Sequence, residues 1–199
     1  LISADGKLLI SEIAENGFLK PTEVPFPMGV ERFDATAVTL TNRVKTYSAS
    51  AKKVFEYDPI SQAWNDSTDS VSGRSVGPFQ MASIRDRWAL LDQGANQLWV
   101  SGATDPVPTA ADGQLQKSSS TGVAAFFSTP TALYSVNLET RKLEQLQDVP
   151  DALITTRPIT FKGNIYSTWL SDSAGWFYAG GEKALKPLDF AAGKLDAAK

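Results

Sequence analysis

An internal repeat of short apolar and aromatic runs limits the folds open to this chain. The runs begin at residues 8, 54, 98, 133 and 176, so consecutive runs start 35 to 46 residues apart. A period of about 40–50 residues is typical of the blades of a β-propeller, in which each repeat forms one small sheet. The runs are Leu8–Ile10, Val54–Tyr57, Leu98–Val100, Leu133–Val136 and Trp176–Tyr178.

Each run is followed by a polar turn and a second strand-like segment, for example at Asp58-Pro59 and Gly180-Gly181. Four of these hairpins are preceded by another pair of segments rich in β-branched and aromatic residues, which favour strands. Four short antiparallel strands per repeat predict a propeller blade. The preceding pairs are ATAVTL with RVKTYSA, VGPFQMASI with RWALLD, LQKSSS with VAAFFST, and TTRPITF with NIYSTWL.

The repeat therefore predicts an all-β, β-propeller-like fold of about four and a half four-stranded blades, either a partial propeller or a fragment of a larger one. We expect helices to be minor or absent, since no segment carries a sustained helical apolar stripe. Phe55, Trp99, Tyr134 and Phe177 should be equivalent, as each is the second residue of its repeat's third strand. The predicted divisions are a partial blade at 1–26, blades at 33–66, 76–109, 115–149 and 154–190, and a polar tail at 191–199.

The chain contains no cysteine and no histidine. Disulfides, thiolate nucleophiles, Ser-His and Cys-His pairs and ordinary zinc sites are therefore excluded. Net charge is -3 with the basic residues scattered, so nothing resembles the basic stripe of a nucleic-acid-binding protein. No apolar stretch approaches the roughly 20 residues that span a bilayer. We predict no catalytic, cofactor-binding or metal-binding residue, no nucleic-acid partner and no membrane contact by this segment.

Two short matches to catalytic motifs are better explained as loops. Gly73–Gly77 fits the G-x-S-x-G nucleophile elbow, but the elbow needs a histidine base and the chain has none. Ser50–Lys53 fits S-x-x-K, a pattern that arises often by chance and lacks its partner motifs here. We expect a Gly/Ser loop between blades at the first site and a solvated hairpin start at the second.

Other polar and aromatic features also fit structural roles. Ser3–Gly6 and Ser171–Gly175 come near the sialidase S-x-D-x-G turn without its spacing, so both are predicted to be ordinary turns. Asn65–Ser67 is a glycosylation sequon that we take as incidental. Among the five tryptophans, those at 88, 99, 169 and 176 lie within apolar strands, which favours core packing over a sugar-binding platform.

The segment Asp151–Phe190, DALITTRPITFKGNIYSTWLSDSAGWFYAGGEKALKPLDF, resembles the N-terminal β-propeller region of large actinobacterial surface proteins with Ig-like or fibronectin type III repeats. The resemblance covers most of the chain, although it is sharpest in this segment. It implies a propeller that follows a single membrane anchor and precedes β-sandwich repeats. It implies no active site that could be placed on residues of this chain. Because the chain begins at Leu1 without an initiator Met or signal peptide, we expect it to lie within a longer protein.

Two functions follow as hypotheses. The first is a non-catalytic binding or scaffold module on a bacterial cell surface, which contacts a protein or a cell-wall glycan through its loops. The alternative is a propeller-fold carbohydrate-active hydrolase or lyase that uses Asp and Glu. Convergence of two or three carboxylates in the central channel would favour the enzyme, whereas walls of Ser, Thr and apolar groups would favour the binding module.

Overall fold

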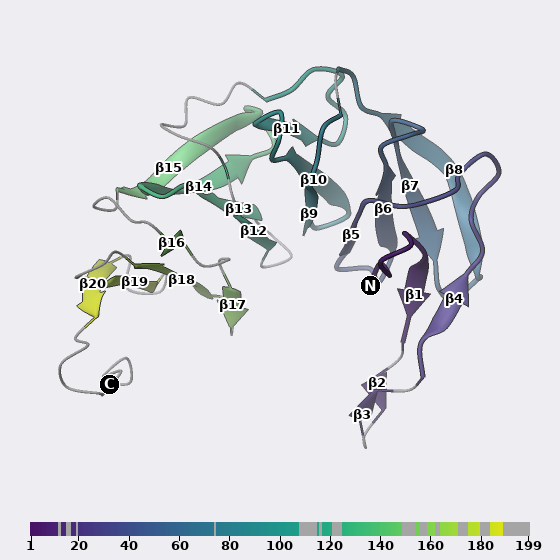
Figure 1. Cartoon of the computed structure of the whole chain (residues 1–199), viewed down its shortest axis with the longest axis horizontal. Coiled ribbons are helices and arrows are strands. Elements are labelled where there is room, and N and C mark those ends of the chain that lie inside the picture. Colours follow the sequence, from purple (N-terminus) through teal and green to yellow (C-terminus); the bar gives the residue numbers. More distant parts are fainter. Residues whose placement is uncertain are drawn as a thin grey trace.

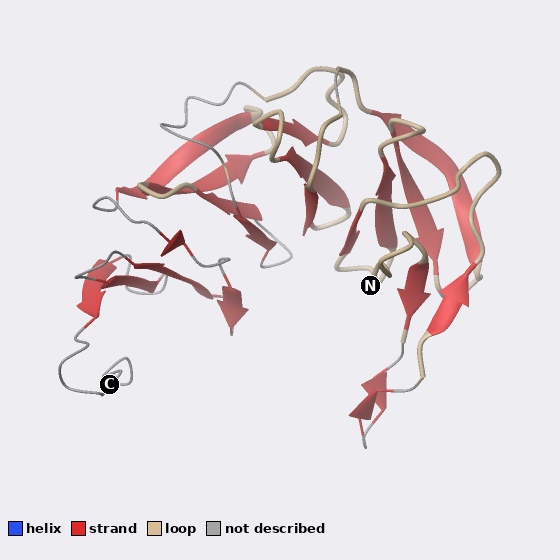
Figure 2. Cartoon of the chain, in the orientation of Figure 1, coloured by secondary structure: helices blue, strands red, loops and turns tan. Residues whose placement is uncertain are grey.

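The structure is a computed structural model of the 199-residue chain. Every regular element in its described part is a β-strand, and paired strands run antiparallel (Figures 1 and 2). The predicted all-β fold is confirmed. The described residues are 1–11, 13–14, 17–18, 20–73, 75–107, 115, 117–120, 125–148, 154–155, 159–161, 164–170, 175–179 and 184–188.

Two of the predicted blades are complete four-stranded sheets whose strands lie in sequence order. Successive buried residues along their central strands, such as AFFS in β13, point to opposite faces, so each sheet has two faces to bury. We call these sheets the second and fourth blades. The second consists of β5 (Ala35–Val38), β6 (Val44–Ser48), β7 (Lys53–Asp58) and β8 (Ala63–Ser70), and the fourth of β12 (Lys117–Ser120), β13 (Ala125–Ser128), β14 (Ala132–Asn137) and β15 (Lys142–Asp148).

The third blade has three strands in its described part rather than the predicted four. Within the predicted fourth strand, Val107 makes only an isolated bridge to Leu98. Pro106 and Pro108 flank Val107 and have no N–H to donate, which prevents a regular ladder. Residues 108–110 of that predicted strand lie outside the described residues. The three strands are β9 (Phe79–Ile84), β10 (Arg87–Asp92) and β11 (Gln97–Val100).

In the first blade, β1 and β4 form a two-stranded sheet. Ile2 bridges Leu8, and the Leu9 N–H donates to the Leu1 carbonyl at 2.9 Å, so the first residues occupy the place of a second strand. The hairpin that follows is longer than predicted, because strand pairing resumes towards its tip. Its strands are β1 (Leu8–Ile10) paired with β4 (Thr22–Val24), and β2 (Ile13–Ala14) paired with β3 (Gly17–Phe18).

In the fifth blade, the predicted first strand TTRPITF is divided into two pieces. Both pieces pair with the same second strand, one near each of its ends. The sheet is therefore a blade with an interrupted inner strand. Its strands are β16 (Ile154–Thr155), β17 (Ile159–Phe161), β18 (Asn164–Leu170), β19 (Gly175–Ala179) and β20 (Ala184–Leu188).

The sheets follow one another around an open arc, from β1 to β20 (Figure 1). Strand β5 lies beside β9, β9 beside β12 and β12 beside β17, so the first strands of successive sheets line the concave side. The last strands, such as β8 and β15, lie on the convex side. This radial order is that of propeller blades and confirms the predicted fold.

The hydrophobic core is a series of layers between neighbouring blades. Phe55 packs towards the first blade beside Leu8, and Trp99 packs towards the second blade. Tyr134 packs towards the third blade. These three residues are equivalent, as predicted from the repeat.

The prediction for the fourth member of this set, Phe177, is wrong. Tyr178, rather than Phe177, is buried against the fourth blade, and Trp176 packs at the same interface. Because side chains alternate across a strand, Phe177 points to the opposite face. Trp176, the first residue of this run, pairs with Trp169 and packs at the interface with the fourth blade, so the second residue, Phe177, lies on the other face.

Candidate functional surface

The strands on the concave side carry hydroxyl, amide and apolar residue types and one lysine, Lys117. The sequences are ATAV in β5, FQMASI in β9, KSSS in β12, IT in β16 and ITF in β17. These described inner strands hold no Asp or Glu. The pair of carboxylates that a glycosidase mechanism requires is therefore not supplied by them.

The elbow-like segment Gly73–Gly77 lies in the loop between β8 and β9. A nucleophile elbow joins a strand to a helix, whereas a strand follows here. The Ser75 hydroxyl lies 2.8 Å from the Tyr47 hydroxyl, and burial raises the pKa of Tyr47, so the phenol is protonated at neutral pH. Arg74 lies outside the described residues. The segment is an inter-blade loop, as predicted.

A buried carboxylate holds this loop in place. Asp92, at the end of β10, is fully buried and accepts the N–H groups of Val76 at 2.8 Å, Gly77 at 2.9 Å and Ala95 at 3.0 Å. Backbone donors that would otherwise be unsatisfied are thereby paired. Asp92 therefore has a structural role.

The other sequence motifs also have structural roles. Lys52 lies in the turn before β7 and Lys53 is the first residue of that strand; both are exposed, and the Lys52 ammonium donates to the Gly73 carbonyl at 2.9 Å. Ser3–Gly6 is a turn closed by the Gly6 N–H donating to the Ser3 carbonyl at 2.9 Å. Ser171–Ala174 lie outside the described residues, as do the side chains of Asp66 and Ser67 in the sequon.

Of the tryptophans, Trp88 and Trp99 are each only 1% exposed, which confirms core packing for both. Trp176 is partly buried against the fourth blade. The side chain of Trp169 lies outside the described residues. The remaining ring, Trp64, packs among Phe33 and other aromatic rings between the first two blades.

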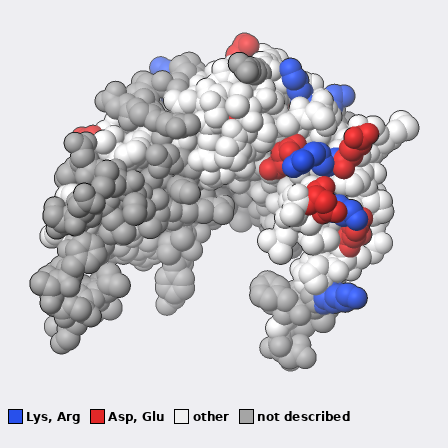
Figure 3. Space-filling model, viewed as in Figure 1, with Lys and Arg blue, Asp and Glu red and all other residues white. Residues whose placement is uncertain are grey.

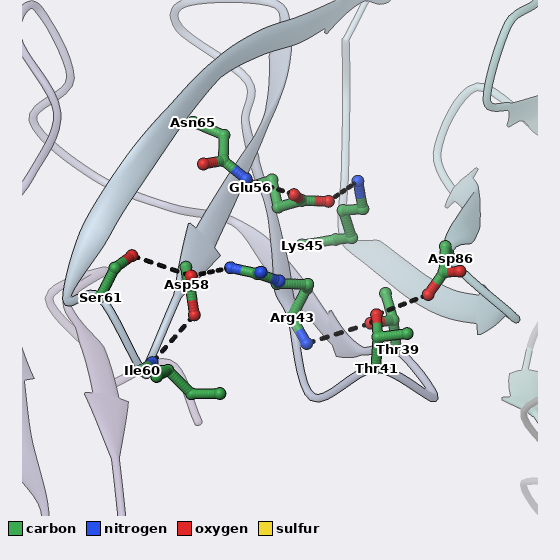
Figure 4. A network of polar contacts seen from close by, with 10 residues as sticks. All are labelled: Thr39, Thr41, Arg43, Lys45, Glu56, Asp58, Ile60, Ser61, Asn65 and Asp86. Atoms are coloured by element: carbon green, nitrogen blue, oxygen red, sulfur yellow. Dashed lines mark hydrogen bonds and ion pairs between the residues drawn. The ribbon is translucent and has the colours of Figure 1, made fainter.

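A set of turns at one end of the second and third blades forms the best-defined surface of the described chain. The turns β5–β6 and β7–β8 lie at the same end of one antiparallel sheet, and the turn β9–β10 comes from the neighbouring sheet. The Leu40 N–H donates to the Arg85 carbonyl at 3.3 Å, and the Thr41 hydroxyl donates to Asp86 at 2.6 Å. We call residues 38–43, 58–62 and 85–86 the turn surface (Figure 4).

An ion pair and hydrogen bonds connect the two turns of the second blade on the side next to the sheet. Arg43 forms an ion pair with Asp58, which also accepts the Ile60 N–H at 2.9 Å and the Ser61 hydroxyl at 2.8 Å (Figure 4). Burial raises the pKa of Asp58, but the bonds from Ser61 and Ile60 and the Arg43 charge outweigh it and hold the pKa at about 2. Asp58 is thus ionised at neutral pH, and the two turns of the second blade are held together.

A second ion pair lies on the sheet next to the turns. Lys45 and Glu56 face each other across β6 and β7, with their side chains only 13% and 16% exposed, and Asn65 also donates to Glu56 (Figure 4). Burial raises the pKa of Glu56, but the bonds from Lys45 and Asn65 outweigh it, so that the pKa lies below its usual value. The base of the turn surface is therefore rigid and internally paired.

The tips of these turns are apolar and exposed. Ile60 is 87% exposed, and Leu40 and Val38 are each 58% exposed. The Lys, Arg, Asp and Glu side chains visible in Figure 3 gather mainly on the N-terminal side of the arc, with both signs interspersed. The turn surface thus combines apolar tips with a fixed, neutralised base. Such a surface can bind by contact, and it offers no unpaired catalytic group among Arg43, Lys45, Glu56 and Asp58.

Sequence reasoning did not single out the residues of the turn surface. The structure marks these tight turns, because Asn42, Gln62 and Arg85 each take a positive φ near 55° there. Non-glycine residues rarely adopt this conformation outside turns. The pairing of Arg43 with Asp58, however, depends on the register of β6 and β7.

Two features are absent from the described residues. No group of three or more Asp and Glu side chains in this part of the chain is arranged to hold a metal ion. Among the same residues, no helix is long and apolar enough to cross a membrane.

The radial sheets and their inner first strands define a β-propeller fold, and the chain is similar to solved propeller-like structures. It matches a streptogramin B lyase with a TM-score of 0.61 and 11% identity over 96% of this chain and 67% of the other. It matches the virginiamycin B lyase of Staphylococcus aureus with a TM-score of 0.53 and 11% identity over 96% and 69%. The extracellular domain of a hybrid two-component system from B. thetaiotaomicron gives 0.56 and 10% over 94% and 28%.

At these identities the likeness shows the fold alone. No protein-family model and no curated protein matches the sequence.

Proposed function

We propose that this chain is a non-catalytic binding module that contacts a protein partner through the turn surface. The observation that carries the proposal is the exposure of Leu40 and Ile60 at turn tips that are bonded together from below. Exposed apolar side chains on a rigid base lose little conformational entropy when they bind, which favours contact with a partner. Loops on a rigid β framework commonly carry such sites.

We further propose that the module belongs to a bacterial cell-surface protein. The support is the resemblance of the chain to the propeller region of actinobacterial surface proteins with Ig-like or fibronectin type III repeats. In such a protein, the propeller would present the turn surface to a neighbouring protein or to cell-wall glycan. We favour a protein because the turn tips are aliphatic, whereas sugars are usually held by polar groups and exposed aromatic rings.

The alternative is a carbohydrate-active hydrolase or lyase. Two structures with a similar fold are described as lyases, which keeps this class in view. The residue types of the inner strands oppose it, since the described strands β5, β9, β12, β16 and β17 carry no carboxylate. The same experiment can distinguish the two functions.

The test measures binding of the fluorescently labelled chain to intact actinobacterial cells. The double variant Leu40→Asp/Ile60→Asp should bind at least about tenfold more weakly, because two charges replace the apolar contacts. Met28, which is fully exposed and lies in the loop between the first two blades, provides the control Met28→Asp. The control should bind as the unaltered chain does, and all three proteins should melt at similar temperatures.

Pretreatment of the cells identifies the chemistry of the partner. Loss of binding after protease treatment indicates a protein, whereas loss only after digestion of the wall glycan indicates a glycan. Equal binding by the double variant and the control would show that the turn surface is not used. Turnover of cell-wall glycan that disappears when an Asp or Glu is replaced would establish the enzyme instead.

A further inference from the structure

The sheet face that points away from the preceding blade is buried in the second, third and fourth blades. Val54 in β7, Leu98 in β11 and Leu133 in β14 each point away from the preceding blade. Each is covered by the blade that follows, and their exposures are 2%, 0% and 0%. The inter-blade contact is therefore a repeated interface with a fixed geometry.

In the fifth blade, no described residue buries the equivalent face in a core cluster. Phe177 occupies the position of Val54, Leu98 and Leu133, because Tyr178 next to it packs towards the fourth blade. Phe177 stacks on Tyr166 of β18, with ring centroids 5.7 Å apart and planes 21° apart. Both rings remain partly exposed, whereas the equivalent residues of the second, third and fourth blades are buried. Two stacked aromatic rings on a sheet face are typical of an interface.

We infer that the face bearing Tyr166 and Phe177 is an inter-blade interface for a further propeller blade, a four-stranded antiparallel sheet that residues 1–199 do not supply. The partner sheet should carry a large aromatic or aliphatic residue in its third strand opposite Phe177. This chain follows that rule three times, with Phe55, Trp99 and Tyr134. The inference concerns how the ring is completed and does not depend on the turn surface.

Size favours a further blade over a second copy of the chain. The chain aligns with 67% of the streptogramin B lyase, so a propeller of that size needs roughly half as many residues again. At one blade per 40–50 residues, that addition is about two blades. Two copies of this chain would instead make about nine blades, more than the four to eight that propellers usually contain.

The experiment supplies a blade of known complementarity. A second copy of residues 76–149 is appended to the full chain, because the third blade already uses Trp88 and Trp99 to cover such a face on the second blade. Hydrogen exchange is then measured at the amides of β18 and β19. These amides should exchange at least about tenfold more slowly in the extended chain, since a covered sheet face opens less often.

Variants show whether the named face is responsible. Phe177→Lys in the extended chain should abolish the slowing, and Tyr166→Lys provides a second variant if the first fails to fold by circular dichroism. Ile60→Lys, at an exposed site remote from this face in the sequence and on a different blade, should preserve the slowing. Slowing that is absent, or that survives both lysine substitutions, would overturn the inference.

Sedimentation of the unextended chain tests the competing occupant. We expect a monomer throughout the micromolar range. A dimer that Phe177→Lys dissociates would show that a second copy covers the face, which would also overturn the inference. Neither result affects binding through Leu40 and Ile60, so the two proposals can fail separately.

Discussion

Asp58 shows how a single side chain connects local geometry to stability. Its carboxylate is held by Ser61, the Ile60 N–H and Arg43, and its pKa of about 2 lies below the ordinary value of 3.8. The ionised form therefore favours the folded state. This contribution is complete above the unfolded-state pKa near 3.8 and disappears as the pH falls towards about 2.

We predict that Asp58→Asn will lower stability at neutral pH and flatten the loss of stability between about pH 4 and 2. Urea denaturation at a series of pH values measures both effects. Asp86→Asn is a matched control on the same surface, because it leaves Asp58 and its partners in place and should keep the steep loss. If the stability of the Asp58→Asn variant fell between about pH 4 and 2 as steeply as that of the unaltered chain, the role of this carboxylate would be contradicted.

At the scale of elements, the third strand of each blade contributes side chains to the layers between blades. Their pairing with the fourth strands is irregular at similar places, since the register shifts between Val54 and Glu56 in the second blade and between Leu133 and Tyr134 in the fourth. A bulge increases the local twist of a strand. Both outer strands therefore bend next to the residues that enter the inter-blade layer.

Trp99 is the largest side chain in the layer between the second and third blades, along with Trp88. We predict that Trp99→Ala will cost about 3–5 kcal/mol of unfolding free energy, because the cavity left between two sheets cannot collapse fully. Phe177→Ala should cost less than about 1.5 kcal/mol, since that ring is partly exposed. Chemical denaturation compares the two variants, and equal losses would contradict the assignment of their faces.

At the scale of the whole molecule, the blades differ in whether residues on both of their faces are buried against a neighbouring blade. The second, third and fourth blades each contribute buried residues to layers on both of their faces. The fifth blade packs on the fourth through Tyr178 but leaves Tyr166 and Phe177 partly exposed on its other face. Stability in such a repeat is a sum of neighbour contacts, so a blade with one neighbour opens more readily.

We therefore predict that the amides of β19 in the chain itself exchange at least about tenfold faster than those of β14. Hydrogen exchange with peptide-level detection measures this directly. The comparison is matched because both are third strands between antiparallel neighbours. Equal protection would mean that the outer face of the fifth blade is already covered in solution.

Much of the fold could be predicted from the sequence because its signals are local. Short apolar runs such as Leu133–Val136 alternate with turn residues at a regular period, and strand pairing between adjacent segments needs no long-range information. The absence of histidine and cysteine excluded whole classes of chemistry on composition alone. Core positions for Trp88 and Trp99 followed from their place within apolar strands.

Other features depended on contacts between distant residues. The face of Phe177 is set by the ladder with β18 and by the fourth blade beside it, and a shift of one residue reverses it. The turn surface brings together Leu40, Asp58 and Arg85, which lie in three different turns. Local pattern therefore determined which residues form strands, whereas strand register and the packing of neighbouring blades decided which side chains meet, because a side chain's neighbours across a sheet are not its neighbours in the chain.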